Sequence, residues 1–179
     1  MIDASTIKNQ LKTNTLQSFY VFTGPEWKVQ QLYIDQIVKV SGKQKKYIDS
    51  ISDIFSKMKN RSFIQQSFVY ILRDDKTLMT DEQLQNRLSS VLSDNILILL
   101  VTNLDKRTKF YKKHGNSICE FEQLKPAILK KYVQKAIDIS DKNCERLMEV
   151  CEYDYGRCLL EIDKIRRYAE SESTIIYDN

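Results

Sequence analysis

The chain has 179 residues, of which 42% are hydrophobic and 29% charged, so it is long enough for one medium domain or two small ones. Lys and Arg number 28 against 24 Asp and Glu, and the resulting net charge of +4 is too small to argue by itself for nucleic-acid binding. A single histidine and four glycines exclude a histidine-rich metal site and a protein built on several glycine-rich loops.

The amino-terminal segment is polar and lacks the apolar core and cleavage site of a signal peptide. The longest apolar run, Ile96–Val101, is too short to span a bilayer. We therefore expect a cytoplasmic protein that makes no membrane contact.

The four cysteines contain no C-x-x-C pair; they are Cys119, Cys144, Cys151 and Cys158. Cys144 and Cys151 share one face of an expected helix with Leu147 and Met148. This spacing predicts thiols buried in a core rather than zinc ligands.

Short β-favouring runs alternate with helical periodicity over the first 121 residues. Strands are expected at residues 19–22, 47–48, 68–72, 96–101 and 117–121. Helices are expected around residues 7–11, 27–40, 51–58, 81–92 and 106–113. The strands at 68–72 and 96–101 are continuous apolar runs, which is typical of strands buried on both faces. The alternation predicts an α/β domain, in which flanking helices cover a parallel sheet.

Beyond residue 121 the pattern is helical, without strands. Pro126 begins one helix, Ser140 and Asp141 begin a second, and a third follows the turn at residues 153–156. We therefore expect an α/β domain over residues 1–121 and a small three-helix domain over residues 122–179. The last nine residues are polar and then β-like.

A phosphate-binding loop would lie directly after the first strand, where the chain has Gly24. Such a loop needs a second glycine, a lysine and a hydroxyl at fixed spacing, and the chain has in their place Val29, Gln30 and Gln31. Asp74 and Asp75 follow a strand as a Mg²⁺-holding acid would, but without a phosphate cradle we interpret the pair as a solvated turn. The sequence predicts a nucleotide-binding fold without nucleotide chemistry, with no metal, cofactor or catalytic residue.

Four stretches carry a resemblance to a known family: FYVFTGPE at 19–26, RSFIQQSFVYIL at 61–72, LDKRTKFYKK at 104–113 and DYGRCLLEIDKI at 154–165. In their order along the chain and their placement on the expected strands and helices, these stretches resemble the delta subunit of the bacterial DNA polymerase III clamp loader. The resemblance implies a degenerate, non-hydrolysing member of the AAA+ superfamily. It covers that family's first two domains, and the third domain, a helical collar, is expected to be absent from this chain.

The resemblance also implies partners and a contact site. Family members bind the ring-shaped sliding clamp and help open it, while sister subunits hydrolyse ATP. By position the clamp-binding residues are Phe63 and Ile64, helped by Met58, and Ser62 stands where the family commonly has another large apolar residue. The implied partners are the sliding clamp, the other clamp-loader subunits and primed DNA. From spacing alone, Phe63 and Ile64 could instead be a helix end that packs into the chain's own core.

An alternative function comes from a basic segment. Residues 106–114 contain Phe110 and Tyr111 between five cations, which are Lys106, Arg107, Lys109, Lys112 and Lys113. Clustered cations with aromatic side chains are typical of a nucleic-acid-binding module. We favour a solvated helix face, with Phe110 or Tyr111 turned inward. His114 is expected at the surface, and Trp27 is expected to pack at a helix start.

Overall fold

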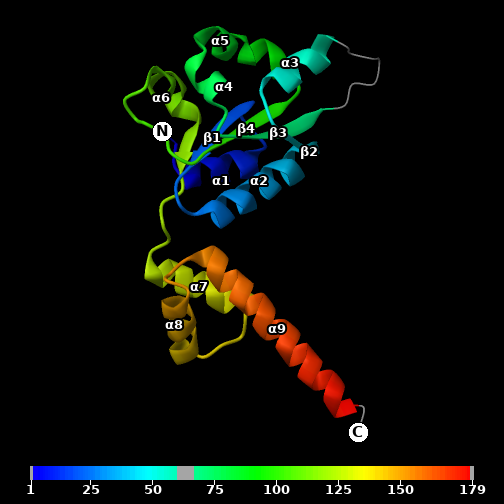
Figure 1. The fold of residues 1–179 in the computed structure, drawn as a ribbon, viewed down its shortest axis with the longest axis vertical. Coiled ribbons are helices and arrows are strands. Elements are labelled where there is room, and N and C mark those ends of the chain that lie inside the picture. Colours follow the sequence, from blue (N-terminus) through cyan, green and yellow to red (C-terminus); the bar gives the residue numbers. More distant parts are fainter. Residues whose placement is uncertain (1, 60–66, 178–179) are drawn as a thin grey trace. The chain divides into compact units, whose positions relative to one another are not determined.

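The structure is a computed structural model that describes residues 2–59 and 67–177. It divides into two units (Figure 1). The first comprises Met1–Pro25 and Val29–Phe121, and the second comprises Glu26–Lys28 and Glu122–Asn179. Among the described residues, no helix combines the length and apolar character needed to cross a membrane.

The first unit is built on a parallel sheet with the strand order β2-β3-β4-β1-β5. Its strands are β1 (Phe19–Thr23), β2 (Gln44–Ile48), β3 (Phe68–Arg73), β4 (Ile96–Val101) and β5 (Ile118–Glu120). Val21 pairs with Leu99 on one side and with Ile118 on the other. Every residue of β1 and β4 is buried. The parallel sheet expected from the sequence is confirmed.

Helices cover both faces of this sheet (Figure 1). They are α1 (Ala4–Thr13), α2 (Trp27–Ser41), α3 (Ser52–Lys59), α4 (Lys76–Thr80), α5 (Glu82–Val91) and α6 (Lys109–His114). Alternate strand residues, such as Val21 and Leu99, join one core with α3 to α6. Phe22 faces the other way and packs against Phe121, which also contacts Tyr33 of α2.

Two details of the first unit differ from expectation. The basic helix begins at Lys109 rather than at residue 106, because the Thr108 hydroxyl accepts the Tyr111 N–H at 3.2 Å and caps the helix there. Lys106 and Arg107 lie in the preceding turn. The short helix α4 was not expected, since its five residues are too few to show a periodic pattern.

The second unit contains α7 (Pro126–Ala136), α8 (Asp141–Val150) and α9 (Tyr155–Tyr177). Its core includes Leu129, Val133, Met148 and Ile162, together with three of the four cysteines. All four cysteines are free and buried, and the described residues offer no group of three or more His, Cys, Asp or Glu that could hold a metal. The expected burial of the thiols is confirmed. The expectation of a β-like tail is wrong, because α9 continues to Tyr177.

Candidate functional site

The loop after β1 is closed by the protein's own backbone. Gly24 has φ +102°, and a Cβ on it would lie 2.4 Å from the carbonyl oxygen of Phe121. The Phe121 N–H donates to the Thr23 carbonyl at 2.8 Å, which holds the end of β5 beside this loop. The glycine is therefore required for a close approach to protein backbone.

The residues at the three phosphate-loop positions serve the fold. Val29 and Gln30 are buried on the first turns of α2. The Gln30 amide donates to the Gly24 carbonyl at 2.9 Å, so the polar group at the lysine position is used inside the loop. Gln31 donates to Asp35 one turn further along the helix, at 3.2 Å. None of these three side chains carries a positive charge, which the lysine of a phosphate-binding loop would supply to the phosphate.

The two acids after β3 are tied to backbone groups. Asp75 is only 8% exposed, and its carboxylate accepts the N–H groups of Ile51 and Leu78, each at 2.8 Å. Asp74, with φ +46°, accepts the N–H and the hydroxyl of Thr102, each at 2.7 Å. The interpretation of this pair as a solvated turn is wrong for Asp75. An Asp three residues before Leu78 is a helix-capping signal that could have been found in the sequence.

Helix α3 ends close to the residues expected to contact the clamp. Ile51, just before the helix, and Ile54, within it, are both buried. The Arg87 guanidinium of α5 lies 4.7 Å from the ring centroid of half-buried Phe55. Met58 belongs to the last turn of α3. Ser62, Phe63 and Ile64 lie outside the described residues, so their role stays a prediction.

The cations of the basic segment mostly have partners within the protein. Lys106 pairs with Glu120 at 2.7 Å, Arg107 with Asp105 at 3.0 Å and Lys109 with Glu82 at 3.1 Å. Lys113 donates to the Asn86 side chain at 2.6 Å. Lys109 and Lys113 thus attach α6 to α5, and Lys106 attaches the preceding turn to the end of β5, while Lys112 is exposed. Phe110 is turned inward and is 2% exposed, as expected.

His114 differs from its expected surface position. Its ring packs edge-on against Phe19 at 5.2 Å between centroids and lies 4.8 Å from Phe110. The Nε2 atom is buried and has no hydrogen-bond partner among the described residues. Burial, with a smaller contribution from Lys113, lowers the pKa of His114 to about 4. His114 follows Phe110 by four residues, so the two side chains lie on the same face of the helix. The inward position of His114 could therefore have been predicted from the sequence.

Two side chains at the start of α2 belong to the second unit. Trp27 is 53% exposed, and its ring lies so close to Gly156 that a Cβ there would be 2.9 Å from it, which agrees with the expected packing role. Glu26 is buried and accepts the Leu124 N–H at 2.9 Å. Burial, together with nearby Asp154, raises the pKa of the Glu26 carboxyl.

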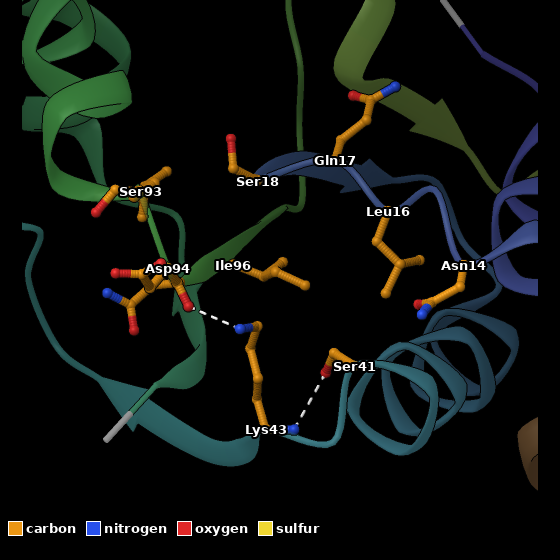
Figure 2. A pocket seen from close by; sticks show the side chains of 11 residues that line it. Asn14, Leu16, Gln17, Ser18, Ser41, Lys43, Ser93, Asp94 and Ile96 are labelled. Atoms are coloured by element: carbon orange, nitrogen blue, oxygen red, sulfur yellow. Dashed lines mark hydrogen bonds between the residues drawn. The ribbon is translucent and has the colours of Figure 1, made fainter. Parts of the chain in front are cut away.

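A polar pocket of about 320 Å³ lies at the amino ends of β1 and β4, the edge opposite to the phosphate-loop position (Figure 2). Lys43 extends across it and donates to the Asp94 carbonyl at 2.8 Å, just beyond the end of α5. Its backbone N–H also reaches the Ser41 hydroxyl at 3.4 Å. The Lys43 ammonium is thus bound to the backbone at the rim of this pocket, which gives it a structural role.

Neither a family model nor a curated protein matches the sequence. Among solved structures, the chain is similar to the DNA clamp loader delta protein of Bacillus subtilis, with a TM-score of 0.59 and 14% identity over 92% of this chain and 57% of that one. A Walker-type ATPase of Pyrococcus abyssi matches with a TM-score of 0.49 and 7% identity, over 98% of this chain and 75% of that one. The chain thus spans little more than half the length of the clamp loader structure. The expected fold, a parallel sheet with flanking helices, is confirmed, and the clamp loader delta protein shares it.

Proposed function

We propose that this chain is a clamp-loader subunit of the delta type, which binds the DNA sliding clamp and helps to open it during replication without hydrolysing ATP itself. The observation that carries the proposal is the fold, which a clamp loader delta protein shares over 92% of this chain. The four sequence stretches that resemble the same family support it independently. Other clamp-loader subunits are the further partners that the proposal implies.

The carboxyl edge of the sheet supports a role without nucleotide chemistry. The Gln30 amide holds the Gly24 carbonyl, and the backbone of Phe121 closes the loop against Gly24. Asp74 and Asp75 are engaged by hydrogen bonds from their own chain. Groups that would otherwise cradle phosphate or hold Mg²⁺ instead stabilise the fold.

The clamp contact is proposed at the end of α3, through Phe63 and Ile64 with Met58 and Ser62. An apolar side chain that leaves water for a pocket on the clamp contributes roughly 1.5–3 kcal/mol. A central aromatic anchor is typically worth 2 kcal/mol or more when it is truncated. The proposed mechanism is insertion of these side chains into the clamp, with the rigid α/β unit as the support.

The proposal is tested by measuring the affinity of the full chain for its cognate sliding clamp by surface plasmon resonance. Phe63→Ala is expected to weaken binding about thirtyfold or more, because it removes the aromatic anchor. Leu32→Ala, which truncates an exposed leucine of α2 on the other face of the sheet, is the control and should bind normally. Unchanged binding by Phe63→Ala, or its unfolding, would show that the site is wrongly assigned.

Primed DNA is the second ligand in this experiment. Three of the five cations of the basic segment already form ion pairs with acidic side chains, which reduces the charge they offer to phosphate. We therefore expect clamp binding to exceed DNA binding by the isolated chain. Tight DNA binding without clamp binding would favour the nucleic-acid-binding module instead.

A further inference from the structure

Helix α3 is attached to the rest of its unit by a buried carboxylate. Asp75, on the loop after β3, accepts the Ile51 N–H through Oδ2 and the Leu78 N–H through Oδ1, both at 2.8 Å. It therefore ties the residue just before α3 to the first turn of α4. Hydrogen bonds from N–H groups to a charged, buried carboxylate are among the stronger ones in proteins.

A second attachment lies one turn further along α3. The Arg87 guanidinium of α5 lies 4.7 Å from the ring centroid of Phe55, within the range of a cation–π contact. Arg87 is exposed, whereas Phe55 is half-buried. The planar guanidinium can stack on the ring in a way that a lysine cannot reproduce.

The two attachments fix the direction of the helix. Ile51 and Phe55 are four residues apart, which is about 6 Å along a helix axis. A helix as short as Ser52–Lys59 is not stable alone in water, so its orientation depends on what holds it. Two fixed points on one side define the axis, and hence where the last turn of α3 points.

We propose that Asp75 and Arg87 are positioning residues for the clamp contact, which hold α3 in the orientation that presents its carboxyl-terminal end to the clamp. This inference rests on the proposed function. A contact segment that is held in place before binding loses less conformational entropy when it binds. Loosening either attachment should therefore weaken clamp binding, although the proposed contact includes neither Asp75 nor Arg87.

The test combines clamp binding with backbone amide hydrogen exchange on the full chain. Arg87→Gln is expected to raise the clamp dissociation constant about three- to tenfold, mainly through slower association, and to speed exchange in α3 while β4 stays protected. Asp75→Asn should act in the same direction, because its amide can accept only one of the two N–H groups. Arg87→Lys should be intermediate. Arg146→Gln, at an exposed arginine of the second unit, is the matched control and should change neither readout.

A double-mutant cycle separates this contact from a general loss of stability. Phe55→Leu removes the ring, so combining it with Arg87→Gln should add little to either single effect. Full additivity, or equal loss of protection in α3 and β4, would overturn the positioning role. Normal clamp binding by both Arg87→Gln and Asp75→Asn, with Phe63→Ala impaired, would overturn this inference alone. Normal binding by Phe63→Ala would overturn the proposed function and this inference with it.

Discussion

At the scale of single residues, His114 is an ionisable side chain held in an apolar environment. Its ring lies between Phe19 and Phe110, and its Nε2 atom is buried without a partner among the described residues. Protonation would place a charge in this apolar setting, so the folded protein binds a proton less readily than the unfolded chain does. The pKa of His114 accordingly falls from 6.5 to about 4.

We therefore predict an acid-dependent loss of stability. Between pH 6.5 and pH 4 the unfolded chain binds the His114 proton and the folded chain does not, so the free energy of unfolding should fall as the pH falls through this window. Allowing for solvent screening of a half-buried ring, the loss should be about 1–2 kcal/mol. Urea unfolding from pH 7 to pH 4 measures it.

His114→Phe provides the comparison for that measurement, because a phenyl ring fills the site without titrating. This variant should lose less stability than the parent chain between pH 6.5 and pH 4. Identical pH profiles for the two proteins would mean that His114 is not the group responsible.

At the scale of secondary-structure elements, α5 connects two parts of the first unit. Its Glu82 and Asn86 contact α6, and its Arg87 contacts α3. The helix is capped by Asp81, whose carboxylate accepts the N–H groups of Gln83 at 2.8 Å and Leu84 at 3.1 Å. This cap satisfies two backbone donors that would otherwise lack partners in the helix.

Asp81→Ala should therefore lower the free energy of unfolding by about 1 kcal/mol, since both capping bonds are lost. Chemical denaturation measures this change. Gln83→Ala, at an exposed position in the first turn, is the control and should stay within about 0.5 kcal/mol of the parent. If the two variants are equally stable, the carboxylate of Asp81 does not cap the helix in solution.

The buried strands were predictable because their signal is local, whereas only the last two residues of the largely exposed β2 were expected. A strand such as Ile96–Val101 is apolar throughout, and burial on both faces requires that pattern. Helix boundaries were harder to place, since the Thr108 cap that shortens α6 at its start involves a single hydroxyl. The bonds from Gln30 to Gly24 and from Ile51 to Asp75 were not predictable, because they depend on how separate segments meet after folding.

At the scale of the whole molecule, a parallel α/β sheet is combined with loops after β1 and β3 whose polar groups are already engaged within the chain. A ligand that binds only the folded state raises stability in proportion to the logarithm of its concentration. An ATP site with a dissociation constant a hundredfold below the ATP concentration would add about 2.7 kcal/mol. For a chain of this size, that corresponds to a rise of several degrees in Tm.

We expect millimolar ATP with Mg²⁺ to shift the Tm of this chain by less than about 1 °C, because Val29, Gln30 and Gln31 offer no cation or hydroxyl to phosphate. Differential scanning calorimetry measures the shift. The cognate sliding clamp, added at saturating concentration, is the positive comparison and should raise the Tm. A clear ATP-dependent rise would identify a nucleotide site and contradict the predicted absence of phosphate binding.

The closed loop at Gly24 limits what a single substitution could achieve there. A lysine at position 30 would remove the amide that holds the Gly24 carbonyl, while the backbone of Phe121 would still press against the loop. A phosphate cradle at this loop would need β5 to move as well as three residues to change. A phosphate site here is therefore out of reach of any one substitution.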